Sequence, residues 1–283
     1  MSPKISVIMP VLNPDPSYLA QAVRSVVSQT MNDWELVIVE DPSPRSAADI
    51  LRAFPDPRIR HVRNVERTSL VAQLNRCLDL ARGTYLARLD ADDVAESDRF
   101  ALQCSLLDSD DRLTVLGCQK TIIGPSDEVL GVRNYPITHS DIRRAIRRFN
   151  PIPHPGVMMR REFVIAAGGY SNDWFCDGAE DYELWWRLLR AGAQFGNHPE
   201  RLLRYRIQPQ QTKAKRLRQQ LCATLETKRA YWDKSFSVAD RLRYWAECVL
   251  LKMPPGLVMR VFLATAYDAA PDARKIAELT SNH

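Results

Sequence analysis

Short apolar runs alternate with helix-like stretches along the first 90 residues. The runs rich in β-branched and aromatic residues are 5–9, 34–39, 59–62 and 85–89. The stretches with helical apolar spacing are 18–30, 47–54 and 70–81. Strands and helices alternating at this spacing favour an α/β fold, a mostly parallel sheet flanked by helices, because parallel strands require crossover connections. Ligands of such sheets bind beyond the carboxyl ends of the strands.

Beyond residue 100 the pattern is less regular. Short strands are expected at 114–118, 120–123 and 156–159, and a basic helix at 140–148. From residue 213 the helical periodicity continues until it is broken by two prolines at 254 and 255. We therefore expect a sheet-containing domain of residues 1–212 followed by a helical carboxy-terminal appendage of residues 213–283.

Composition excludes several classes of protein. Only 11 Gly and 18 Pro among 283 residues exclude a collagen-like or low-complexity chain. The 39 Lys and Arg exceed the 34 Asp and Glu by 39 − 34 = 5, an excess too small to indicate nucleic-acid binding by itself. The six cysteines form no CxxC pair, so a zinc site is not expected.

Two features bear on location. Residues 1–4 lead directly into a strand-like run and lack the sections of a secretory signal. No window supplies the roughly 20 apolar residues of a spanning helix. We expect a cytoplasmic protein that touches a membrane peripherally, at its inner face, without crossing it.

Three acids follow the fourth apolar run in the segment Leu89-Asp-Ala-Asp-Asp93. Carboxylates held together at a loop repel one another unless a cation is present. Oxygen ligands suit Mg²⁺ or Mn²⁺, and Mg²⁺ is commonly completed by substrate phosphates. The alternative is a surface turn that caps a helix starting near Ser97.

Asp41 stands at the end of the second apolar run, so a parallel sheet could bring it beside the loop that contains Asp90. Such a carboxylate can accept a hydrogen bond from a nucleotide base. The alternative is a simple turn, because Asp41-Pro-Ser-Pro44 has a typical turn composition.

Glu180 and Asp181 lie at the expected start of a helix and are the catalytic candidates. A carboxylate there that faces a cleft can take a proton from an attacking hydroxyl. The alternative is that the helix dipole alone favours acids at this position. The segments around His154 and 168–170 could shape the cleft, and His154 and Trp185 are the acceptor-side candidates, although His154 alone also suits a structural role.

These motifs resemble, in order and spacing, those of the family 2 glycosyltransferases with the GT-A fold, which is Rossmann-like. The segments that carry the resemblance are 5–13, 34–41, 89–93, 168–170 and 180–181. It extends over roughly residues 4–207. The resemblance implies a nucleotide-sugar-binding catalytic domain that transfers a sugar from a nucleotide diphosphate, with inversion at the anomeric carbon.

The resemblance also implies roles for single residues. Pro10 and Asp41 would hold the nucleotide base, and Asp90 the ribose or the metal. Asp92 would hold the metal, Mn²⁺ or Mg²⁺, and Asp181 would be the general base. The enzyme expected is a metal-dependent, hexosyltransferase-type glycosyltransferase of bacterial-type surface glycan synthesis, with a glycan or lipid-linked acceptor and no nucleic-acid partner.

The sequence departs from the family pattern in three places. Glu40-Asp-Pro-Ser43 stands where the family often has Asp-Asp-Gly-Ser. Gln208 follows the late Tyr-Arg-Ile segment, where members often carry a His after the Tyr-Arg pair, so a late imidazole ligand is not expected. The Gln-x-x-Arg-Trp signature of processive synthases is missing, which favours the addition of one or a few sugars.

Two alternatives compete with this assignment. A sugar-phosphate nucleotidyltransferase usually needs a Gly-rich loop after the first strand, but residues 10–13 contain no glycine. A non-catalytic protein could bind a membrane surface through basic residues placed over apolar ones. Those residues are Lys213, Lys215, Arg216, Arg218, Lys228 and Arg229, with Leu217, Leu221 and Leu225 beneath. Its own alternative is a solvated helix face packed on the catalytic domain.

Overall fold

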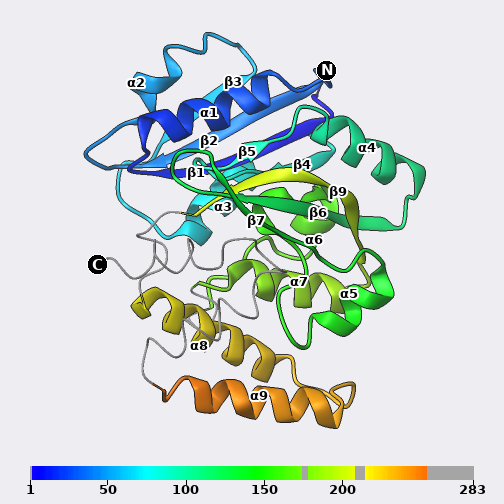
Figure 1. Cartoon of the computed structure of the whole chain (residues 1–283). Helices are drawn as coiled ribbons and strands as arrows, with labels where there is room; N and C mark the ends of the chain where they lie inside the picture. Colours follow the sequence, from blue (N-terminus) through cyan, green and yellow to red (C-terminus); the bar gives the residue numbers. More distant parts are fainter. Residues whose placement is uncertain (1, 174–177, 208–213, 254–283) are drawn as a thin grey trace.

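The computed structural model describes residues 2–173, 178–207 and 214–253. Within these ranges the strands form one nine-stranded sheet in the order β3-β2-β1-β4-β8-β6-β9-β5, with β7 paired to β6 (Figure 1). The strands are β1 Ile5–Leu12, β2 Trp34–Asp41, β3 Ile59–Arg63, β4 Tyr85–Arg88, β5 Val94–Ala95, β6 Leu113–Ile123, β7 Val129–Arg133, β8 Met158–Arg160 and β9 Gln194–Arg206.

Helices cover both faces of this sheet (Figure 1). The helices are α1 Pro16–Val27, α2 Ala47–Leu51, α3 Leu70–Leu80, α4 Arg99–Ser109, α5 His139–Ala145, α6 Arg161–Ala166, α7 Glu180–Arg190, α8 Ala214–Ala230 and α9 Val238–Leu250, with a 3₁₀ turn at His154–Gly156. The expected α/β architecture is confirmed.

The first half of the sheet matches the sequence prediction. Strands β1, β2, β3 and β4 pair in parallel, with β1 between β2 and β4. The second half is mixed, because β8 runs antiparallel to both β4 and β6. The sheet is therefore parallel where the strand and helix alternation was regular and mixed where it was not.

Two details of the second half differ from the prediction. The strands expected at 114–118 and 120–123 are one strand, β6, whose pairing with β9 shifts register at Gln119. The shift explains the apparent break, because a bulge interrupts the alternation of side chains. Strand β9, with 13 residues, was not predicted.

The strand register brings the carboxyl ends of β1, β2 and β4 to one edge. Ile8 pairs with Arg88, and Leu12 pairs with Asp41. Asp90 follows Arg88 by two residues, so it lies near the level of Pro10. Pro10, Asp41 and Asp90 thus share the edge where ligands of parallel sheets bind.

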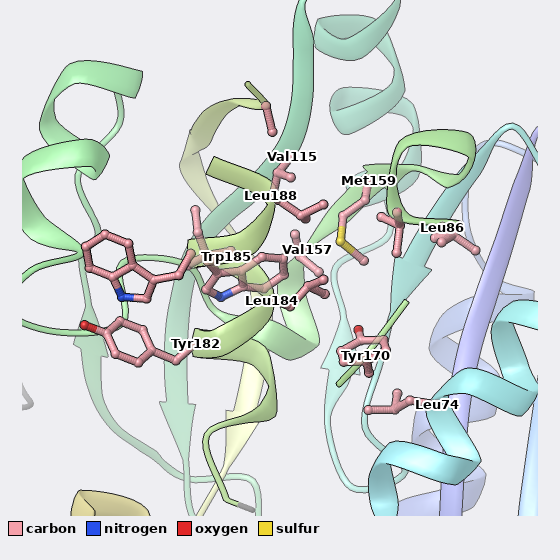
Figure 2. Close-up of a cluster of buried hydrophobic side chains, with 14 of the residues drawn as sticks. Leu74, Leu86, Val115, Val157, Met159, Tyr170, Tyr182, Leu184, Trp185 and Leu188 are labelled. Carbon is pink, nitrogen blue, oxygen red and sulfur yellow. The ribbon is translucent and has the colours of Figure 1, made fainter. Parts of the chain in front are cut away.

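Two hydrophobic clusters fill the space between the sheet and its helices. One contains residues of α1 and α4, and the other contains residues of α3 and α7. Figure 2 shows the second, in which Leu184, Trp185 and Leu188 of α7 lie among side chains that include Val157 and Met159. This packing fixes α7, and with it the acids at its first turn, against the sheet.

The helices after residue 213 pack on α7. The ring of Trp186 stacks on Tyr231 and Phe236, with centroids 5.6 Å and 5.8 Å apart. Lys228 is 1% exposed and its Nζ lies 2.5 Å from a carboxylate oxygen of Glu247. The prediction of a helical segment is confirmed for α8 and α9, whereas the domain boundary at 212 remains a prediction because residues 208–213 lie outside the described ranges.

The alternative in which basic and apolar residues around α8 bind a membrane is wrong for two of those residues. Leu225 is 3% exposed, and the Lys228 ammonium is paired inside the protein. Lys213 lies outside the described residues, and the side chains of residues 215–217 are not described either. Among the described helices, none is both long enough and apolar enough to cross a bilayer.

Candidate active site

Asp90 forms an ion pair with Arg88, the last residue of β4. The Arg88 side chain is only 3% exposed, and its Nε and Nη1 atoms have no hydrogen-bond partner among the described residues. Burial lowers the pKa of Arg88, but the charge of Asp90, its hydrogen bond and the other nearby acidic groups together outweigh burial, so the pKa lies above its usual value. A buried cation thus stands directly behind the acidic loop.

Asp93 points into the protein, whereas Asp90 and Asp92 are partly exposed. Its Oδ1 accepts a hydrogen bond of 2.8 Å from the Arg206 amide, and its Oδ2 has no partner among the described residues. Burial and the neighbouring charges of Asp92 and Asp90 raise the pKa of Asp93 well above its usual range. Asp93 therefore anchors the loop on its buried side, whereas Asp90 and Asp92 lie on its partly exposed side.

Arg206, at the end of β9, holds the acidic loop through hydrogen bonds. It was not predicted as a site residue. Its Nε donates to the Asp92 carbonyl at 2.9 Å, and Nη1 donates to the Gly124 carbonyl at 3.0 Å. Its Nη2 lies 2.6 Å from Asp127 Oδ1, and the guanidinium sits 4.3 Å from the ring centroid of Tyr18. The late Tyr-Arg pair in the sequence is the signal that could have identified it.

Asp41 is 1% exposed and already has partners. Asn64 Nδ2 donates to its Oδ1 at 2.5 Å, and the Thr68 amide donates to its Oδ2 at 2.7 Å. The carboxylate thus ties the loop after β3 to the end of β2, a role that sequence reasoning missed. Contact of Asp41 or Pro10 with a nucleotide base stays a prediction.

The acids of α7 lie in its first turn, with Asp181 held on both oxygens. Asn150 Nδ2 donates to Oδ2 at 2.6 Å, and the Tyr182 amide donates to Oδ1 at 2.8 Å. Burial raises the pKa of Asp181, although the Asn150 hydrogen bond opposes the rise. Burial and the charge of Asp181 raise the pKa of Glu180 to about 7. A carboxylate with a raised pKa is suited to proton transfer near neutral pH.

Arg88 connects the two acidic groups electrostatically. Its charge lowers the pKa of both Glu180 and Asp181, and the charge of Asp90 raises that of Glu180. The acids at the start of α7 are therefore within electrostatic range of the loop after β4. The fold brings together the two acidic motifs that the sequence separates by about ninety residues.

His154 and Trp185 lie beneath the site. His154 is 7% exposed, and its Nε2 is 2.8 Å from the Tyr170 hydroxyl. Burial and the nearby Arg88 charge hold its pKa well below the usual range, so the ring is neutral. Trp185 is fully buried in the cluster of Figure 2, so an acceptor-side contact of Trp185 is not supported by its position.

The turn at residues 168–170, which follows α6, is held in place by Asn75, another residue that sequence reasoning missed. Its side chain exchanges two 2.8 Å hydrogen bonds with the backbone of Tyr170. Gly169 has a φ of +67°, and a Cβ there would meet Asn75 Oδ1 at 2.7 Å. Glycine is thus required by both the backbone conformation and the close contact.

The acidic loop supplies few protein ligands for a metal. Across residues 2–173, 178–207 and 214–253, no cluster of three or more His, Cys, Asp or Glu side chains is placed to hold an ion. Asp90 and Asp92 provide two carboxylates. Their negative charges raise the pKa of Asp93, and a bound cation would relieve this repulsion. This set fits a hard ion that takes one or two carboxylates and completes its shell with substrate phosphates.

Comparison with known proteins identifies the family. The model of the Glycosyl transferase family 2 matches residues 6–168, more than half of the chain. The chain belongs to this family. It is 29% identical over 227 residues to the O-antigen biosynthesis glycosyltransferase WbnJ of Escherichia coli, covering 78% of this chain and 86% of the relative.

Solved structures agree on the GT-A fold. A mannosyltransferase from Pyrobaculum calidifontis, solved in complex with GDP-Man and Mn²⁺, superposes with a TM-score of 0.63 at 18% identity, over 98% of this chain and 79% of that one. TarS of S. aureus gives 0.60 at 15% identity over 83% of this chain, which spans 44% of that longer protein.

Membership makes the chain a glycosyltransferase and does not favour the nucleotidyltransferase or non-catalytic alternatives. The stretch matched by the family 2 model includes Asp41, Asp90 and Asp92. Glu180 and Asp181 lie beyond it, so their assignment depends on the geometry described above.

Proposed function

We propose that this family 2 glycosyltransferase moves a sugar from a nucleotide diphosphate donor to an acceptor hydroxyl with inversion, and that Asp181 is the general base. The observation that carries the proposal is the electrostatic link through Arg88 between Asp90 and the acids of α7. It supports a donor-side role for Asp90 together with a role as proton acceptor for Asp181. The charge of Asp181 also acts on the neighbouring residue Glu180 and raises its pKa.

The proposed reaction is a single displacement. Asp181 accepts the proton of the acceptor hydroxyl while the hydroxyl oxygen forms a bond to the anomeric carbon. The bond from that carbon to the diphosphate oxygen breaks on the opposite face, and its electron pair leaves with the nucleoside diphosphate. Attack from the opposite face inverts the anomeric configuration.

On the donor side, Pro10 and Asp41 would contact the base, and Asp90 the ribose or the metal. Asp92 would hold the divalent ion, Mn²⁺ or Mg²⁺. When bound, the ion offsets the negative charge that develops on the departing diphosphate. The Mn²⁺ in the complex of the Pyrobaculum mannosyltransferase supports the use of a divalent ion.

We further propose that the acceptor is a glycan or a lipid-linked glycan of surface polysaccharide synthesis, and that the enzyme works on the cytoplasmic side of a membrane. The O-antigen biosynthesis function named for the Escherichia coli relative supports this acceptor class.

A donor screen tests the reaction class. We expect incubation with UDP- and GDP-sugars, Mn²⁺ and a glycan acceptor to release nucleoside diphosphate. EDTA should reduce the release by at least about tenfold, because without the metal ion no divalent cation offsets the negative charge of the diphosphate. Thermal shift with UDP or GDP, with and without Mn²⁺, reports donor-side binding independently of the acceptor. Pyrophosphate release from nucleoside triphosphate and sugar phosphate would contradict the proposal.

The pH profile tests the general base through Asn150. The ionised form of Asp181 is the active one, so transfer declines as pH falls below its pKa. Asn150→Ala removes a hydrogen bond that favours the charged form, and we expect the acid limb of the kcat/KM profile to move to higher pH. Asn150→Asp should move it further by adding like charge. A uniform loss of rate without a shift of the limb would indicate a merely structural role.

A further inference from the structure

The outer face of α9 carries a row of exposed apolar side chains. Val238, Leu242, Trp245 and Val249 are 73%, 66%, 65% and 53% exposed. They follow one another at intervals of four, three and four residues, so they lie along one side of the helix. We call these four residues the α9 stripe. In Figure 1, α9 lies at the edge of the molecule farthest from the sheet, with α8 between them.

The opposite side of α9 already holds the helix in place. Asp240 accepts a 2.8 Å hydrogen bond from Arg148 Nε, and Glu247 lies 2.5 Å from Lys228 Nζ. Tyr244 packs edge-on against Trp232, with ring centroids 5.0 Å apart. Because these contacts use the inner face, the α9 stripe is not needed to dock the helix.

The acidic residues of α9 lie on its inner side, whereas its basic residues lie on both sides, because Arg243 pairs with Glu247. Its two acidic residues, Asp240 and Glu247, are the ones paired on the inner side. Arg241 is exposed and lies three residues after Val238 and four before Trp245, so it borders the stripe. Lys252, three residues after Val249, is also exposed just beyond the helix end. The outer face is therefore apolar with a positive border.

We propose that the α9 stripe is a membrane-docking surface that lies on anionic lipid. Apolar side chains that include a Trp, bordered by Lys and Arg, suit the boundary between headgroups and acyl chains, where apolar burial and attraction to anionic headgroups add. A symmetric contact between two copies through this face is less suitable, because it would bring positive borders together. The proposal extends the proposed function by giving the enzyme access to lipid-linked acceptors, but vesicle binding does not depend on transfer.

Vesicle sedimentation of the full chain tests the proposal. We expect binding to phosphatidylcholine vesicles that contain phosphatidylglycerol, and at least about tenfold weaker partitioning to phosphatidylcholine alone. Leu242→Glu/Trp245→Glu should abolish binding to both. Arg241→Gln/Lys252→Gln should lose about tenfold on the anionic vesicles only. Val129→Glu, at a 67% exposed apolar residue of β7, is the matched control and should bind as the parent does.

Three results would overturn the proposal. Equal binding of the parent and the stripe variants would place the contact elsewhere. Absence of vesicle binding by the parent would remove the contact altogether. A parent dimer that Leu242→Glu/Trp245→Glu converts to a monomer, seen by sedimentation velocity, would assign the stripe to a second copy. Circular dichroism checks folding of each variant, and the Arg241→Gln/Lys252→Gln variant tests the surface without disturbing apolar residues.

Discussion

Replacing Asp181 by Asn is expected to reduce sugar transfer by about 10²- to 10⁴-fold, because a positioned general base supplies a factor of this size. The substitution keeps the shape of the side chain but leaves one oxygen acceptor, so only one of the two donors, Asn150 Nδ2 or the Tyr182 amide, keeps its hydrogen bond. Donor binding, measured by thermal shift with nucleoside diphosphate and Mn²⁺, should stay within about twofold, because Asp181 is proposed to act on the acceptor.

Two further variants serve as comparisons for Asp181→Asn. Glu180→Gln leaves the base in place. The charge of Asp181 is one of the causes that raise the pKa of Glu180, so Glu180 stays protonated while Asp181 ionises, and the acid limb should keep its position with a smaller loss of rate. Asp111→Asn changes a fully exposed carboxylate and should transfer sugar as the parent does. Parental rates in Asp181→Asn would show that another group takes the proton.

Replacing Arg206 by Ala is expected to destabilise the protein by about 3–5 kcal/mol, the loss typical when one partner of a buried charged network is removed. The side chain is fully buried, and its removal leaves the carbonyls of Asp92 and Gly124 without this donor. Chemical denaturation would measure the loss as a lower midpoint with an unchanged slope.

Arg204→Ala is the matched control, because it removes the same side chain from the same strand, two residues earlier. Within the described part of the chain, the hydrogen bond of its guanidinium is a long 3.5 Å contact with the Asp127 carbonyl. We expect a change within about 0.5 kcal/mol, as for surface substitutions. An Arg206→Ala variant as stable as Arg204→Ala would mean that the acidic loop does not depend on the buried guanidinium.

The first four strands and the helices between them were predictable from sequence because their signal is local. In a run such as 34–39 every residue except Glu35 is apolar, since the strand is buried on both faces, and the pattern needs no knowledge of distant residues. Helix α3 begins after Ser69, whose side chain accepts from the Ala72 amide, so its cap also depends only on residues that are near in sequence. The second half of the sheet was less predictable, because β6 contains register shifts and β9 pairs with strands far away in sequence.

The residues of the candidate site also differ in how well the sequence predicts them. Asp90, Asp92 and Asp181 stand out in the sequence because acids directly after a strand or at a helix start carry a chemical meaning of their own. Asn150 does not stand out, and Arg206 is marked only by the late Tyr-Arg pair, because each acts on a carboxylate or a loop through a contact between distant residues. The burial of Trp185 was not predictable for the same reason, since an aromatic ring on an amphipathic helix faces either a cleft or a core according to what packs against it.

The amino-acid order alone determined the α/β class, the acidic loop after β4 and the acids that begin α7, since these follow from local periodicity and residue type. Tertiary structure alone decided that the charge of Arg88 acts on both sets of acids, that Asp93 turns inward while Asp92 remains partly exposed, and that α9 presents an apolar face outward. Burial and electrostatic range depend on which distant segments pack together, and local pattern does not encode that packing.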